Sequence, residues 1–146
     1  MSTLVDTNVL LRRIQPGHGQ HGVAVESVAR LVEAHQPVYF ALQNIAELWN
    51  VATRPVSSNG LGLSIERVEA EVGKIEQYLD LLPDSPAVYD EWKRLVVSRG
   101  VRGSKVHDAK LVATMNVHSV RRILTFDLGD FARYDIDAIH PASLSL

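Results

Sequence analysis

The chain has 146 residues, of which 46% are hydrophobic and 22% are charged, and these values favour one folded domain over a disordered chain. Fifteen Lys and Arg against 17 Asp and Glu give a formal net charge of −2, so any nucleic-acid contact must come from a local basic patch. The sequence contains no cysteine, which excludes disulfides, thiolate zinc sites and cysteine nucleophiles.

The first half of the chain alternates short apolar runs with helical patterns. Leu4 and Val5 predict a short strand that stops at Asp6, and Asp6 is expected near the cap of the helix that follows. Three glycines within residues 16–22 predict a flexible break. Further along, we expect a helix over 23–35, a strand over 37–41 and a helix over 43–54.

The second half continues the same alternation after a loop over residues 55–63. The expected elements are a helix capped by Ser64, a strand near 79–82, a helix from Pro86 to about 98 capped by Ser85, a helix from Ser104 to Met115, a strand over 122–126 and a strand near 136–139. Short strands separated by helices, without two-residue hairpin turns, favour parallel pairing. The sequence therefore predicts a three-layer α/β/α domain over residues 1–146, with a mainly parallel sheet of four or five strands.

Four acidic residues are predicted to lie where such a sheet places its ligands, beyond the carboxyl ends of the strands. Asp6 and Asp127 each follow a predicted strand, and Asp108 lies in the first turn of a predicted helix. Glu47 lies off the apolar stripe of its helix, on the same side as Asn44. Taken singly, these residues also suit helix caps, turns or a solvated helix face.

Convergence of these carboxylates would have a definite electrostatic consequence. Two like charges 4 Å apart repel by about 4 kcal/mol at an effective dielectric of 20, so a cluster must take up protons or hold a cation. Oxygen ligands without sulfur favour Mg²⁺ or Mn²⁺. If the four acids meet, the sequence points to metal-assisted phosphodiester chemistry.

Four segments resemble, in order, the motifs of PIN-domain nucleases. They are Leu4–Leu11, Asn44–Trp49, His107–Ala113 and Leu124–Phe131. The resemblance covers essentially the whole chain, and its compact length is like that of the VapC-type toxins of bacterial toxin–antitoxin pairs.

The resemblance implies an Mg²⁺- or Mn²⁺-dependent endoribonuclease, the toxin of a type II toxin–antitoxin pair, in which a metal-activated water hydrolyses RNA. The residues that would hold the metal are Asp6, Glu47, Asp108 and Asp127. Those that would orient the carboxylates or the water are Thr7, Asn8, Asn44 and Thr125. Asp130 is the alternative fourth acid and is otherwise expected to cap the turn before Phe131.

The resemblance also implies partners for the chain. It implies an RNA substrate, a small antitoxin protein and homodimerisation. The sequence itself predicts no membrane segment, because no apolar run is long enough to span a bilayer, and the lack of cysteine suits the cytoplasm. Arg99, Arg102 and Lys105 lie in a glycine-containing segment before Asp108, where they would hold RNA phosphates or form an ordinary solvated loop.

Two other functions compete with the nuclease hypothesis. A catalytically silent PIN-like module would bind RNA or protein, but it would have little reason to keep four acids. A phosphohydrolase with an aspartate nucleophile would need a second acid at the position of Asn8. His18 and His21 have no cysteine to complete a zinc site, and a solvated loop is the favoured interpretation for both.

Overall fold

The computed structural model describes residues 1–146 and contains a five-stranded sheet in the order β3-β2-β1-β4-β5. The strands are β1 (Thr3–Val5), β2 (Val38–Ala41), β3 (Asp80–Leu82), β4 (Arg122–Leu124) and β5 (Asp137–Ile139). Every neighbouring pair is parallel, which confirms the predicted α/β/α class with its parallel sheet.

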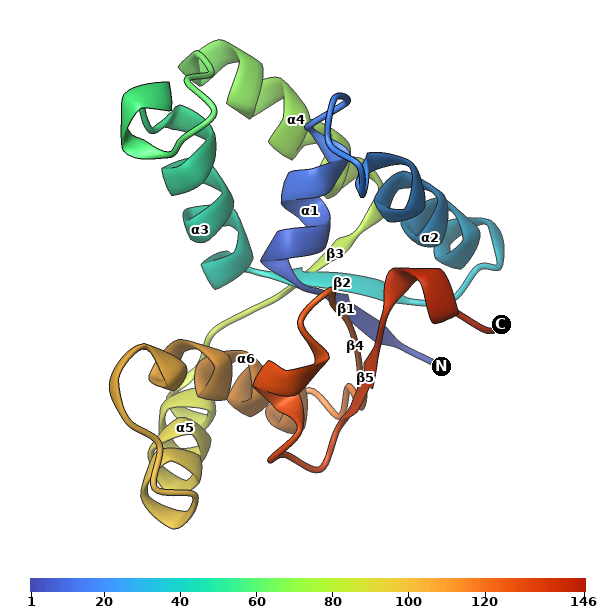
Figure 1. Cartoon of the computed structure of the whole chain (residues 1–146). Helices are drawn as coiled ribbons and strands as arrows, with labels where there is room; N and C mark the ends of the chain where they lie inside the picture. The colour runs from blue at the N-terminus through green and yellow to red at the C-terminus, as the bar shows by residue number, and fades with distance from the viewer.

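Helices cover both faces of this sheet (Figure 1). On one face lie α1 (Thr7–Arg13), α2 (His21–Glu33), α3 (Leu42–Thr53) and α4 (Ile65–Tyr78). On the other face lie α5 (Pro86–Ser98) and α6 (Val106–Val117). Four short 3-10 helices complete the chain: η1 (Val56–Ser58), η2 (Gly103–Lys105), η3 (Leu128–Phe131) and η4 (Pro141–Ser143). None of the helices combines the length and the apolar character that crossing a membrane requires.

The two-residue period of the strands divides the core between the two helical layers. In β1, Val5 packs with the core beneath α1 to α4, whereas Leu4 packs with the core beneath α5 and α6. In β4, Leu124 and Ile123 divide in the same way. All four side chains are fully buried, so the central strands are covered on both faces, as parallel sheets require.

Most of the predicted helix starts are confirmed. Ser64 and Ser85 cap α4 and α5 by accepting hydrogen bonds from the backbone N–H groups three residues on. Two predicted starts are wrong. The break at 16–22 ends early, because α2 begins at His21. Ser104 does not cap α6: it lies inside η2, which Gly103 opens with a positive φ of 59°, and α6 begins after it.

The strand order determines where the functional edge lies. From β1 the chain moves outward through β2 and β3, and it then returns across the sheet to place β4 on the other side of β1. Adjacent parallel strands whose connections leave in opposite directions open a crevice at their carboxyl ends. Asp6 directly follows β1, and Thr125 directly follows β4, so both lie at this crevice.

Candidate active site

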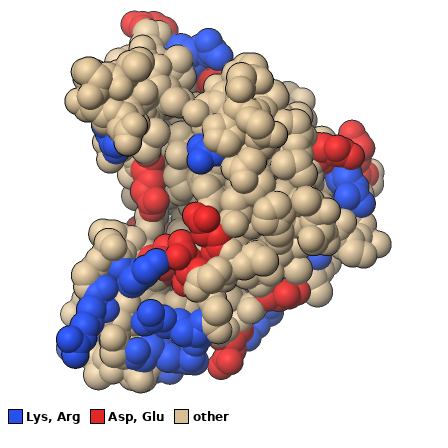
Figure 2. Space-filling model, viewed as in Figure 1, with Lys and Arg blue, Asp and Glu red and all other residues tan.

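Acidic side chains from three helices converge at the crevice. Asp6 is the N-cap of α1, Glu47 lies in the second turn of α3, and Asp108 lies in the first turn of α6. They are close enough that the charges of Glu47 and Asp108 both raise the pKa of Asp6. Figure 2 shows acidic side chains gathered in a hollow of the surface, with Lys and Arg side chains along its lower border.

Asp6 is the most deeply placed of these acids, with 8% of its surface exposed. Its Oδ1 accepts a hydrogen bond of 2.7 Å from the Thr7 backbone N–H, and its Oδ2 accepts one of 2.8 Å from the Thr125 hydroxyl. Burial raises the pKa of Asp6 from 3.8 to about 7, although both hydrogen bonds act in the opposite direction. Asp6 is therefore a carboxylate that would ionise readily beside a bound cation and reluctantly without one.

Asn8 and Thr125 join the ends of β1 and β4 into one polar network. The Asn8 amide Nδ2 lies 3.2 Å from both Thr125 Oγ1 and Asp127 Oδ2. The Asn8 Oδ1 accepts a 3.2 Å hydrogen bond from the Phe126 N–H, and Thr125 Oγ1 accepts a 3.0 Å bond from the Asp127 N–H. These bonds determine where the segment after β4 passes the Asp6 carboxylate.

Asn44 forms a second set of hydrogen bonds, which links the start of α3 to α1. Its Oδ1 accepts a 2.8 Å hydrogen bond from the Ala41 N–H, and its Nδ2 donates a 3.1 Å bond to Thr7 Oγ1. Asn44 is completely buried, so this link between α1 and α3 is shielded from water. It fixes the helix turn from which Glu47 projects.

Two acceptor atoms on α3 have no hydrogen-bond partner although they are buried: Glu47 Oε1 and Gln43 Oε1. The amide of Gln43 donates a 2.8 Å hydrogen bond to the His107 carbonyl, which ties α3 to α6 beside Asp108. Buried acceptors without a donor are costly and uncommon, so these two indicate an absent donor or cation. Gln43 was missed by sequence reasoning, although its position four residues before Glu47 places both on one helix face.

Asp108 and Asp130 form the outer part of the site. Burial and the charge of Asp130 raise the pKa of Asp108 from 3.8 to about 6. The Lys105 ammonium lies 2.7 Å from Asp130 Oδ1 and 3.9 Å from Asp108 Oδ2. The expectation that Asp130 caps its turn is wrong: Asp127 occupies the N-cap position of η3, and Asp130 lies within it and pairs with Lys105.

Asp127 is placed differently from the other predicted acids. It is exposed, and its carboxylate accepts the hydrogen bond from Asn8 at the end of β4. The structure therefore places Asp6, Glu47 and Asp108 near enough for their charges to interact, and the charge of Asp130 acts on Asp108. Asp127 is held instead by its hydrogen bond with Asn8.

The three predicted basic residues have different surroundings. Arg99 donates to the Arg133 carbonyl and lies over the Tyr134 ring, with its guanidinium carbon 5.9 Å from the ring centre. Arg102 is exposed and occupies the N-cap position of η2. Lys105 alone among them contacts the acids. Sequence reasoning missed Arg133, whose charge acts on Lys105.

The donor set can be tested against a divalent cation. In the arrangement that the structure shows, no three His, Asp or Glu side chains stand close enough together to hold a metal ion between them. The acids nevertheless supply only oxygen donors, burial and neighbouring carboxylates raise the pKa values of Asp6 and Asp108, and Glu47 offers a buried acceptor without a partner. These features fit a hard cation such as Mg²⁺ or Mn²⁺, which would draw the carboxylates inward.

A Thr125→Val variant tests whether the polar network supports the site. We expect the free energy of unfolding at pH 8 to fall by about 2 kcal/mol, because the buried Asp6 carboxylate loses a hydrogen-bond donor. Urea unfolding measures this change. Thr114→Val is the matched control, since its hydroxyl is also buried but donates to the Lys110 carbonyl within α6. An equal loss in both variants would contradict a special role for Thr125.

Comparisons with known proteins bear on the family and the fold. The family model described as PIN domain matches residues 3–137. No curated protein matches the chain in sequence.

Solved structures of similar fold come from several bacteria. VapBC2 from Rickettsia felis, bound to a promoter DNA fragment, has a TM-score of 0.67 at 14% identity, covering 96% of this chain and 98% of that chain. VapC20 from Mycobacterium tuberculosis, described as a Sarcin-Ricin loop cleaving toxin, has a TM-score of 0.67 at 18% identity, covering 92% and 97%. A toxin–antitoxin complex from Klebsiella pneumoniae has a TM-score of 0.64 at 18% identity, covering 97% and 99%. At these identities the likeness concerns the fold.

Proposed function

Because the chain belongs to the PIN domain family, we propose that it is a metal-dependent endoribonuclease, the toxin of a type II toxin–antitoxin pair. The observation that carries this proposal is the convergence of Asp6, Glu47 and Asp108 at the crevice between β1 and β4. The proteins of similar fold include one described as a toxin that cleaves the sarcin-ricin loop, which supports RNA as the substrate.

The proposed metal ligands are Asp6, Glu47, Asp108 and Asp127, with Asp130 as the alternative to Asp127. A bound Mg²⁺ or Mn²⁺ supplies positive charge for the phosphate and lowers the pKa of a coordinated water. The unpartnered Glu47 Oε1 and the pKa values of Asp6 and Asp108, which burial and neighbouring carboxylates raise, support this assignment.

The chain's own residues prepare the site for that cation. The Thr7 N–H and the Thr125 hydroxyl hold the two Asp6 oxygens, and Asn8 holds the Asp127 carboxylate. Asn44 fixes the turn that carries Glu47, through its bond to the Thr7 hydroxyl. Such bonds reduce the reorganisation that ligands undergo when a cation binds.

The basic residues beside the hollow are proposed to bind the RNA backbone. Arg99, Arg102 and Lys105 come from the connection between α5 and α6, next to Asp108. Contacts of Lys and Arg with phosphates position a nucleic acid without reading its sequence. The proposed substrate is therefore held by its phosphates at the border of the acidic hollow.

The remaining proposals concern assembly and location. We propose that residues 1–146 form one PIN-like domain that works in the cytoplasm, forms a homodimer and is restrained by an antitoxin. The toxin–antitoxin complex of similar fold supports the antitoxin partner.

A cleavage assay tests the proposed function. The purified chain is incubated with a structured RNA in Mn²⁺, in Mg²⁺ and in EDTA, and single-stranded DNA of the same sequence serves as the control substrate. We expect RNA fragments with either metal and none with EDTA. RNA binding without cleavage in all three conditions would instead indicate the catalytically silent module.

A further inference from the structure

Lys105 is the one basic side chain that forms ion pairs with the acids of the candidate site, which are Asp6, Glu47, Asp108, Asp127 and Asp130. Its ammonium bridges Asp130 at 2.7 Å and Asp108 at 3.9 Å. The other ion pairs of the chain lie elsewhere: Arg67 and Lys74 with Glu71, Arg94 with Glu91, Arg99 with Asp135, and Lys110 with Asp84. A divalent cation that enters the hollow therefore finds Asp108 and Asp130 already paired with Lys105.

We propose that Lys105 is an internal counter-cation, which holds Asp108 and Asp130 in the metal-free protein, competes with the divalent cation for them, and transfers to an RNA phosphate once that cation binds. This inference rests on the proposed function, because it takes Asp108 as a metal ligand.

The charges explain why the contact is competitive. A single ammonium cannot neutralise Asp6, Glu47, Asp108 and Asp130 together, so a divalent cation is still attracted to the hollow. Lys105 and the divalent cation would both use Asp108. A divalent cation on Asp108 would repel the Lys105 ammonium, which lies 3.9 Å from Asp108 Oδ2. Binding of the cation must therefore weaken or break the contact of Lys105.

The segment that carries Lys105 can release it without disturbing the core. Gly100 and Gly103 both precede Lys105, with φ values of +60° and +59°, and neither glycine has a neighbour within the space of a side-chain methyl group. The Lys105 side chain is 48% exposed, and that of Asp130 is 34% exposed. Rotation of the lysine therefore breaks two ion pairs that solvent reaches, and it moves a side chain that lies outside the buried core.

A released Lys105 would face the basic border of the hollow rather than open solvent. Asp130 raises the pKa of Lys105, and Arg133 is close enough for its positive charge to act in the opposite direction. Like charges gathered in this way favour an anion between them, and Figure 2 shows Lys and Arg side chains running along the edge of the acidic hollow. A phosphate of the RNA backbone meets that requirement, so the lysine that leaves the carboxylates gains a new partner.

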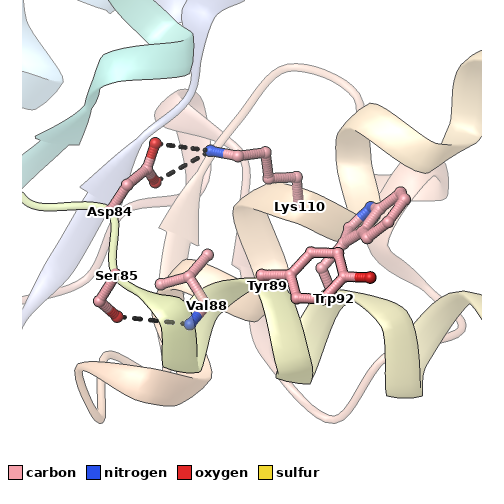
Figure 3. Close-up of a pocket in the computed structure, with 6 residues that line it drawn as sticks. All are labelled: Asp84, Ser85, Val88, Tyr89, Trp92 and Lys110. Carbon is pink, nitrogen blue, oxygen red and sulfur yellow. Dashed lines mark hydrogen bonds and ion pairs between the residues drawn. The ribbon is translucent and has the colours of Figure 1, made fainter.

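Lys110 provides a matched control. It lies in α6, five residues after Lys105, and its ammonium lies 3.0 Å from Asp84. Figure 3 shows this pair at a separate pocket of about 340 Å³ that Val88, Tyr89 and Trp92 help to line. Removal of Lys110 takes away the same charge from the chain but leaves Asp108 and Asp130 with their counter-cation.

Calorimetric titration of the full-length chain with Mn²⁺, without RNA, tests the proposal. We expect Lys105→Ala to bind Mn²⁺ about two- to fivefold more tightly than wild type, which corresponds to the loss of one exposed ion pair. Lys105→Arg and Lys110→Ala should bind like wild type. In RNA cleavage at saturating Mn²⁺, Lys105→Ala should raise KM, because the substrate loses a phosphate contact, and Lys105→Arg should restore it.

The outcomes separate this inference from the proposed function. If wild type binds Mn²⁺ and cleaves RNA, but Lys105→Ala binds Mn²⁺ equally or more weakly, the counter-cation is refuted and the nuclease stands. If wild type neither binds Mn²⁺ nor cleaves RNA, both are refuted. Tighter Mn²⁺ binding by Lys110→Ala to the same extent would also refute the inference, because the effect would then reflect net charge alone.

Discussion

Asp108→Asn will cleave RNA roughly 10³-fold more slowly than wild type at saturating Mn²⁺. The asparagine keeps the shape of the side chain in the first turn of α6, but it lacks the charge that a divalent cation requires. The fold will persist, because burial and the charge of Asp130 raise the pKa of Asp108. Removal of this negative charge therefore stabilises the metal-free protein. Initial cleavage rates and a thermal melting curve measure both effects.

Asp84→Asn is the control for this experiment. Asp84 also pairs with a lysine, but it does so outside the acidic hollow, so its variant should cleave RNA at the wild-type rate. Cleavage by Asp108→Asn at the rate of Asp84→Asn would contradict the active-site assignment. A melting temperature well below wild type would show that Asp108 is needed for folding instead.

Local patterns were sufficient to predict the elements and the places of several candidate site residues within them. Asp6 was expected near a helix cap because it follows two apolar residues, and it is the N-cap of α1. Asp108 was expected in a first helical turn, and it lies there although α6 begins later than predicted. Glu47 was expected off the apolar stripe, and it lies near enough to Asp6 for its charge to raise the pKa of that carboxyl. Each of these predictions depends only on neighbours within one or two helical turns.

The remaining features depend on contacts between distant segments. The strand order follows from how helices pack on the two faces of the sheet, and no local pattern encodes it. The bond from Gln43 to the His107 carbonyl joins residues 64 positions apart, and the pair of Lys105 with Asp130 joins residues 25 apart. Ser104 had the residue type of a cap, but the 3-10 turn opened by Gly103 determined the actual helix start.

The metal-free protein will lose stability as the pH rises from 5 to 8. Asp6 ionises near 3.8 in the unfolded chain, but burial raises its pKa to about 7 in the folded chain. Between these values the folded state binds more protons than the unfolded state, so the free energy of unfolding falls with rising pH and levels off above about 7. About two of the roughly three pKa units of this shift lie above pH 5, so Asp6 accounts for about 3 kcal/mol of the loss between pH 5 and pH 8, and Asp108 acts in the same direction.

Urea unfolding in EDTA at pH 5 and pH 8 measures this loss, and Asp6→Asn should remove most of it. Asp90→Asn, which changes an exposed aspartate of α5, should leave it intact. Mn²⁺ should oppose the loss at pH 8, since it binds the ionised carboxylates of the folded state, and a concentration of 100 Kd adds about 2.7 kcal/mol. If Asp6→Asn keeps both the pH dependence and the Mn²⁺ effect, then Asp6 neither carries the buried charge nor binds the cation. If it loses both together, one carboxylate links the instability of the empty site to its affinity for metal.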